Sequence, residues 1–74
     1  MTADALTWRQ STEAIGPHGE LCVRHDCVEY PRLYCLSQRA SVETEWYECY
    51  FVYGIGAQWW HTADEALQAM RANP

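Results

Sequence analysis

Cysteine and histidine side chains that could bind a metal gather in the first two thirds of the chain. Cys22, His25 and Cys27 lie within six residues, and Cys35 and Cys49 follow at longer intervals. A structural zinc site normally uses two closely spaced pairs of ligands, and this spacing does not supply them. We predict no metal site and no cofactor, and expect buried free thiols that pack as small apolar side chains. A zinc-stabilised module stays open as an alternative, because strand alternation can place His25, Cys27, Cys35 and Cys49 on one side of a sheet.

A cysteine nucleophile is the second chemistry to consider. It needs a base and a residue that orients the base close in space. His18, His25 or His61 could each act as the base, but no local signature selects one of them. A substrate site also needs concave surface, which a chain of 74 residues offers sparingly. We therefore predict that the protein is not an enzyme and has no catalytic residues.

Carboxylates beside aromatic residues form the most promising group. Three glutamates surround the start of the aromatic segment 46–60, and two more carboxylates close an earlier segment. If these segments are paired strands, the carboxylates form a negative edge that suits an arginine-rich partner through ion pairs and cation–π contacts. The alternative is a solvated strand face with ordinary cross-strand pairs. The candidate partner-binding residues are Glu43, Glu45, Trp46, Glu48, Tyr50, Asp26 and Glu29.

The strands that must position these residues are indicated by alternating side chains. Residues 20–27 and 33–39 alternate and predict two strands. Residues 44–53 predict the clearest strand, and residues 6–10 a shorter one. Turn-forming residues at 16–19 separate the strand 6–10 from the strand 20–27.

The side chains of the strand 44–53 fall into two sets on opposite sides of the sheet. We expect the first set, which is uniformly apolar or aromatic, to face the core: Tyr47, Cys49, Phe51 and Tyr53. We expect the second set, which is mixed, to face solvent or a partner: Trp46, Glu48, Tyr50 and Val52. Gly54 and Gly56 then bend the chain.

A helix is predicted over residues 62–73. Thr62 and Glu65 match a capping box. The apolar residues that follow share one helical face at the expected spacing: Ala63, Ala66, Leu67 and Met70. A helix of about ten residues is marginal alone, so it must pack on the sheet.

These elements predict one α+β domain over residues 1–74, with an antiparallel sheet of three to four strands and the C-terminal helix packed on one face. We expect residues 1–5 to be a loose N-terminal end. A chain this short buries only about 60% of its unfolded surface, so its core is small. The predicted core residues are Leu21, Val23, Leu33, Cys35, Tyr47, Cys49, Phe51, Ala63, Ala66, Leu67 and Met70.

The charge of the chain limits its partners. Ten carboxylates face five arginines and no lysine, for a net charge of −5. This argues against direct binding to nucleic acid or to an anionic membrane. No segment approaches the roughly 18 apolar residues that cross a bilayer, and MTADALTWRQ lacks the pattern of a secretory signal. We therefore expect a cytoplasmic protein with reduced thiols.

In overall character the chain resembles the small acidic anti-CRISPR proteins that phages encode against bacterial defence. The lysine-free acidic composition, the aromatic strand 46–53 and the closing helix in HTADEALQAM carry the resemblance. It is a likeness of type across the whole chain without a shared motif, so it assigns no residue a role. The strand-to-helix joint also looks like that of HicB-type antitoxin domains, over about a dozen residues explained equally well by a capping box. The proline- and glycine-rich segment that precedes the joint in those domains is absent.

The resemblance and the charge together predict a function. We expect a non-catalytic protein-binding inhibitor, encoded by a phage and acting in the host cytoplasm. Its acidic and aromatic surface would block a basic, nucleic-acid-binding surface of a CRISPR–Cas complex. The alternatives are a small structural or regulatory homodimer that pairs through an edge strand, and the zinc-stabilised module.

Overall fold

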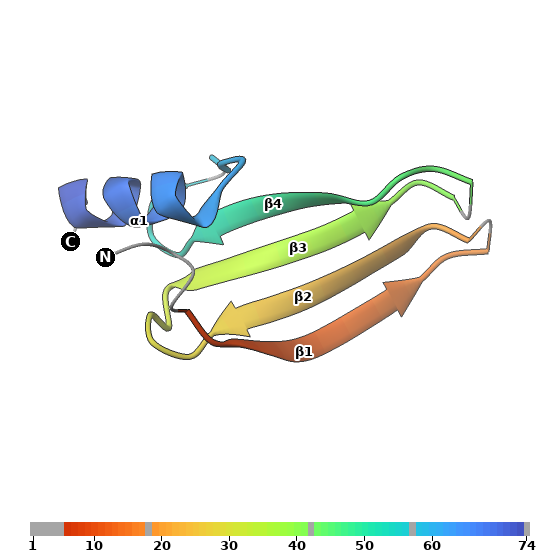
Figure 1. Ribbon diagram of the computed structural model, residues 1–74, viewed down its shortest axis with the longest axis horizontal. Helices are drawn as coiled ribbons and strands as arrows, with labels where there is room; N and C mark the ends of the chain where they lie inside the picture. Colours follow the sequence, from red (N-terminus) through yellow and green to blue (C-terminus); the bar gives the residue numbers. More distant parts are fainter. Residues whose placement is uncertain (1–5, 18, 42, 57, 74) are drawn as a thin grey trace.

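The computed structural model describes residues 6–17, 19–41, 43–56 and 58–73. Within these residues the chain forms four strands and a helix, in the order β1 (Trp8–Ile15), β2 (Leu21–Cys27), β3 (Leu33–Arg39), β4 (Tyr47–Val52) and α1 (Ala63–Ala72). The strands form one antiparallel sheet in chain order, and α1 lies at one end of it (Figure 1). The predicted α+β fold is confirmed. The predicted loose end at 1–5 lies outside the described residues.

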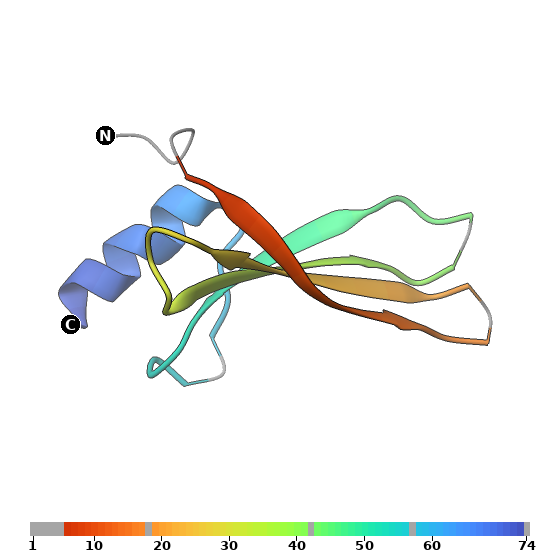
Figure 2. The ribbon, with the colours of Figure 1, turned by 90° about the horizontal axis from the view of Figure 1, so that it is seen from below.

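The two ends of the sheet differ. The β2–β3 turn lies at the end near α1, whereas the β1–β2 turn and the β3–β4 connection lie at the opposite end (Figure 1). We call this opposite end the distal end. Figure 2 shows the sheet extending well beyond the helix. A ten-residue helix is only about 15 Å long, against the 39 Å length of the molecule, so it covers only part of one face.

The pairing register decides which side chains share a face with the helix. We call this side the helix face. Starting from α1, its first row holds Trp8, Cys27, Leu33 and Val52, and its second holds Gln10, His25, Cys35 and Tyr50. The buried core lies between the first row and the helix and consists of Cys27, Leu33, Val52, Ala66 and Leu67.

The predicted facing of β4 is wrong. Val52, expected on the solvent side, is 3% exposed in the core beneath α1, and Tyr50 packs against the same cluster. The aromatic set instead points to the other side of the sheet, where Tyr47 is 54% and Tyr53 49% exposed. We call that side the open face. Phe51 is only partly buried there, whereas Cys49 is buried among its neighbours.

The turn after β4 explains why α1 packs on the side of Tyr50. Gly54 and Gly56 adopt φ values of 91° and 82°, which favour glycine, and the chain reverses where the sequence predicts a bend. It then returns along the outer edge of β4, where Tyr50 and Trp60 exchange two backbone hydrogen bonds of 2.9 Å. The helix begins three residues later and covers the side to which Tyr50 and Val52 point.

The remaining core predictions are mostly confirmed. Leu21 and Met70 are only partly buried, and Tyr47 is exposed. The predicted core residues that are buried are Val23, Leu33, Cys35, Cys49, Ala63, Ala66 and Leu67.

The bounds of the first strand differ from the prediction. The strand β1 continues to Ile15 by pairing with β2, with an irregularity between Gln10 and Thr12.

The threonine half of the predicted capping box is confirmed, whereas the Glu65 carboxylate bonds the Thr62 hydroxyl rather than the Thr62 backbone N–H. The Thr62 hydroxyl oxygen accepts a 3.2 Å hydrogen bond from the Glu65 backbone N–H and donates a 3.0 Å bond to the Glu65 carboxylate. At the other end, Arg32 donates to the backbone oxygens of Asn73 and Tyr53 at 3.1 and 3.0 Å. Arg32 therefore ties the C-terminal end of the helix to the turn after β4.

Candidate functional site

Five of the predicted partner-binding residues lie along β4 and the connection before it. Glu43, Glu45 and Trp46 precede β4 at the distal end, and all three are exposed. Glu48 and Tyr50 follow in β4, with side chains on the helix face. The Arg39 guanidinium lies 5.2 Å from the centre of the Trp46 ring. This contact orients the ring, which is 47% exposed.

The other two predicted residues lie apart from this group. Asp26 is on the open face in an ion pair with Arg24, with 2.9 Å between Oδ1 and Nε. Burial raises the pKa of Asp26, but the hydrogen bond from Arg24 and other contacts outweigh it, so the pKa lies below its ordinary value. Glu29 lies in the β2–β3 turn near α1 and accepts a 2.7 Å bond from the Thr7 N–H, which lowers its pKa. The structure therefore does not bring these carboxylates to the negative edge.

A cavity on the helix face includes two of the predicted residues. Its volume is ≈ 210 Å³. At its wall, the Tyr50 hydroxyl donates a 2.6 Å hydrogen bond to the carboxylate of Glu48, which is exposed to solvent. The rings of Trp8 and Tyr50 lie 5.8 Å apart, centre to centre. We call it the Glu48 cavity; its lining residues are Trp8, His25, Cys35, Ser37, Glu48 and Tyr50.

The groups beside Glu48 stay protonated at neutral pH. Burial raises the pKa of the Cys35 thiol to about 11, with a contribution from the Glu48 charge. Burial and the hydrogen bond to Glu48 also raise the pKa of Tyr50 well above its usual range. Glu48 therefore has neutral neighbours in the thiol and the phenol, and its carboxylate makes the cavity suitable for a cation.

The same pKa argues against nucleophilic chemistry at Cys35. Its thiol is the cross-strand neighbour of His25, the arrangement that a cysteine–histidine pair would need. A thiolate is the reactive form, and a thiol with a pKa of about 11 is almost entirely protonated at pH 7. Of the other candidate bases, His61 packs against Trp59 with ring centres 4.8 Å apart, and His18 lies outside the described residues.

The structure separates the four residues that the zinc alternative needs as ligands. All four cysteines are free thiols. His25, Cys27 and Cys35 share the helix face, but Cys49 pairs with Leu36 and points to the open face. The expected common side for these four ligands is therefore wrong. Within the described residues, no group of three or more potential ligands is close enough to hold a metal ion.

Charge is distributed unevenly along the sheet. The distal half is the part beyond the row of Arg24, Leu36 and Cys49. Five glutamates against one arginine give it a net charge of −4, whereas four carboxylates and four arginines balance in the other half, counting described residues. The distal set comprises Glu13, Glu20, Glu43, Glu45, Glu48 and Arg39. The Glu48 cavity lies at the border of this acidic half.

The sequence patterns missed a cluster on the open face. Tyr34 stacks on Phe51 with ring centres 5.1 Å apart and meets Tyr53 at 4.9 Å. Arg24 lies over the Tyr34 ring at 4.2 Å. In the described part of the chain, no helix or strand covers this face. Alternation within β3 and within β4 is the signal that could have indicated these aromatic sides. The contact between them depends in addition on which residues pair across the two strands.

Comparison of the chain with protein-family models, with curated proteins and with solved structures finds no match. Within the residues that the structure describes, no helix has the length and apolarity needed to cross a bilayer. Function must therefore be inferred from the chemistry of the Glu48 cavity, of the acidic distal half and of the open face.

Proposed function

We propose that the protein is a non-catalytic protein-binding domain whose acidic distal half docks on a basic surface of a partner. The observation that carries the proposal is the Glu48 cavity, which combines a carboxylate with two aromatic rings. A carboxylate beside ring faces is the environment that an arginine or lysine side chain prefers. An arginine or lysine of the partner enters this cavity.

The Glu48 cavity by itself has room for a side chain rather than for a drug-sized ligand. Pockets for drug-sized ligands measure about 300–1,000 Å³, and the Glu48 cavity is smaller, at ≈ 210 Å³. A second cavity, of ≈ 460 Å³, shares Trp8 and Tyr50 and reaches the start of α1 at Asp64. The two cavities together provide a path for a basic segment between two carboxylates.

The rest of the distal half acts mainly on encounter and orientation. Exposed ion pairs contribute only about 0–1 kcal/mol each, so three exposed glutamates cannot by themselves give tight binding. They do attract a basic surface and raise the association rate, in a manner that salt weakens. The exposed Trp46 ring adds the kind of side chain that dominates binding energies at interfaces.

A nucleic-acid-binding surface is the partner surface that we favour. Such surfaces are strongly basic because they neutralise phosphates, so a domain with an acidic half competes with nucleic acid for them. The resemblance to anti-CRISPR proteins supports the sharper form of the proposal. In that form the domain is encoded by a phage and blocks a CRISPR–Cas complex in the host cytoplasm.

Affinity capture from a bacterial lysate tests this proposal. We expect the wild-type domain to retain a nucleic-acid-binding protein that elutes as salt is raised and whose nucleic-acid complex the domain disrupts in a gel-shift assay. The double variant Glu45→Gln/Glu48→Gln should lose this capture. Glu29→Gln is the matched control, because it removes the same kind of charge far from the cavity and its amide oxygen still accepts from Thr7.

Two results would contradict the proposal. The first is a captured protein that the double variant retains as strongly as the wild type. The second is capture that does not change between low and high salt, because a contact led by carboxylates must weaken as counterions screen it.

A further inference from the structure

The open face has the composition of a protein interface. Tyr47 and Tyr53 expose about half of their surface, and between them Phe51 stacks on Tyr34. Large exposed apolar patches on small proteins mark contact sites, and tyrosine, phenylalanine and arginine are enriched in interfaces. Binding of a basic partner by the distal carboxylates does not explain why these aromatic rings are exposed on the open face.

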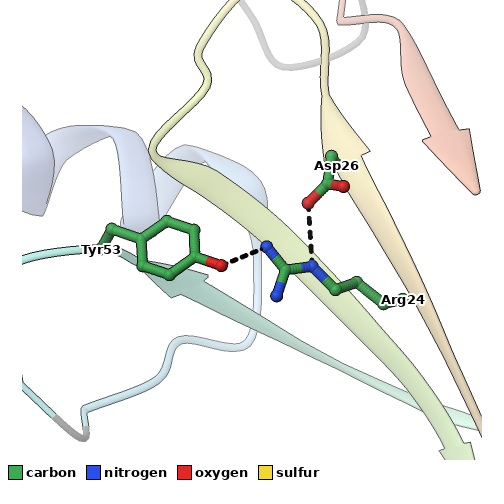
Figure 3. A network of polar contacts seen from close by, with 3 residues as sticks. All are labelled: Arg24, Asp26 and Tyr53. Carbon is green, nitrogen blue, oxygen red and sulfur yellow. Dashed lines mark hydrogen bonds and ion pairs between the residues drawn. The ribbon is translucent and has the colours of Figure 1, made fainter. Parts of the chain in front are cut away.

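Arg24 is already ordered on this face. It extends from β2 across β3 and donates to the hydroxyl of Tyr53, just beyond the end of β4 (Figure 3). Its Nε donates to Asp26 at 2.9 Å, and the ring centres of Tyr34 and Tyr53 lie 4.2 and 5.3 Å from its guanidinium. Binding loses less entropy when an arginine is held in place beforehand.

We propose that a second copy of this chain packs its own open face on this one, forming a symmetric homodimer. The charges on the face fit that occupant. In a two-fold symmetric contact, a residue of one copy that meets a second residue of the other copy is itself met by that residue's counterpart. The face carries both signs in Arg9, Arg24 and Asp26. Arg9 of one copy, which is exposed, can therefore meet Asp26 of the other, while Arg24 and Asp26 keep their ion pair within each copy.

The net charge of the chain also selects this face for self-association. Two copies with a charge of −5 each repel one another in most orientations. Glu13 and Glu48 point to the helix face, while the described charges on the open face sum to +1. Contact through the open faces therefore keeps these carboxylates apart. An acidic partner would be repelled by the whole chain, and a basic one is drawn to the distal half.

Pairing through an edge strand is less favourable. Trp60 occupies the backbone groups of Tyr50 on the outer edge of β4. The other edge, β1, is largely polar and has an irregularity between Gln10 and Thr12. Irregular, polar edges are the usual protection against edge-to-edge pairing.

The size of the face sets the strength of the contact. Four strands spaced by about 4.8 Å and rising about 3.3 Å per residue give roughly 400 Å² of flat area. A stable interface buries about 800 Å² per partner, and side chains increase the flat value only partly. We therefore expect a weak dimer of the size class of transient complexes. The dimer does not rest on the proposed function, because the two use different faces.

Sedimentation velocity over a concentration series, paired with NMR spectra of the same samples, tests the dimer. We expect the monomer to convert to a dimer as concentration rises, with chemical shifts changing at Tyr34, Phe51 and Tyr53. The variant Tyr47→Ser/Tyr53→Ser should weaken the dimer at least tenfold. Both rings expose about half of their surface and lie outside the buried core, so this variant keeps the core, which a thermal melt checks.

Trp46→Ser is the matched control, because it removes an equally exposed ring from the other face and should leave the dimer unchanged. A chain that stays monomeric throughout the series would overturn the proposal. So would a dimer whose shift changes follow the edges of β1 or β4, or one that the tyrosine variant leaves intact. A wild-type domain that dimerises but captures no nucleic-acid-binding protein would overturn only the proposed function.

Discussion

Truncation of Leu33 and of Phe51 tests the facing of the sheet. Leu33 is 0% exposed between the sheet and α1, so Leu33→Ala leaves a cavity that the surroundings cannot fill. Such substitutions cost about 2–5 kcal/mol, and the complete burial of Leu33 places it at about 3–5. A chain of 74 residues has a free energy of unfolding of about 4–11 kcal/mol. Leu33→Ala should therefore remove much of the stability.

Phe51→Ala should cost less, although phenylalanine is the larger side chain. A fully buried phenylalanine loses about 3–5 kcal/mol on truncation, but Phe51 is partly exposed on the open face. Its stacking on Tyr34 at 5.1 Å adds only about 0.5–1.5 kcal/mol beyond the buried area. We expect a total loss of about 2 kcal/mol.

Urea unfolding followed by circular dichroism measures both losses. Low protein concentration keeps the dimer from contributing to stability, and an unchanged dependence on urea confirms that the same surface is exposed. Leu33→Met and Phe51→Leu are the matched controls, and each should cost less than about 1.5 kcal/mol. A loss for Phe51→Ala that equals or exceeds that for Leu33→Ala would refute the assignment of the two faces.

Three further predictions concern the helix cap, the carboxylates and the thiols. Thr62→Ala should lower the free energy of unfolding by about 1 kcal/mol, and Thr62→Ser should restore most of it, because the hydroxyl accepts the bond that caps the helix. The pKa values of Asp26 and Glu29 are lowered on folding, so their contribution to stability is present above their ordinary values of 3.8 and 4.5 and is lost as pH falls further. Urea midpoints measured from pH 7 to acid should fall less steeply in Asp26→Asn and Glu29→Gln, and an unchanged slope would contradict this. Cys22, the one cysteine that is not buried, should react first with a thiol reagent at pH 8, and equal reactivity of buried Cys35 would count against the sheet arrangement.

The sequence was sufficient to predict the element types. Alternation over 33–39 and the capping residues Thr62 and Glu65 are local signals, and each forms the expected element. Local signals work here because strand alternation and helix capping depend on neighbours in the chain. Residues 11–15 give no such signal, because three polar residues are followed by Ala14 and Ile15 without alternation, and they join β1 only through pairing with β2.

The facing of β4 could not be predicted for a physical reason. Tyr50 and Val52 on one side, and Phe51 and Tyr53 on the other, are similarly apolar, so composition does not tell which side a helix covers. The choice depends on the path of the chain through the turn after β4 and on the pairing of Tyr50 with Trp60. That pairing is a tertiary contact that leaves no periodic signal.

The candidate site was predictable only where its residues are close in sequence. Glu48 and Tyr50 lie two residues apart in one strand and meet in the cavity. Asp26 and Glu29 share only their charge with these two residues, because the first pairs with Arg24 and the second with Thr7. The partners of these two carboxylates come from the fold and from the register of β2.

NMR titration of the labelled domain with a short arginine-rich peptide tests the proposed cation site most directly. We expect shift changes at the Trp8 indole N–H, Glu48 and Tyr50 that weaken with salt and disappear in Glu48→Gln. Shift changes centred on Tyr34 and Tyr53, or none at all at low salt, would contradict a cation site in the Glu48 cavity.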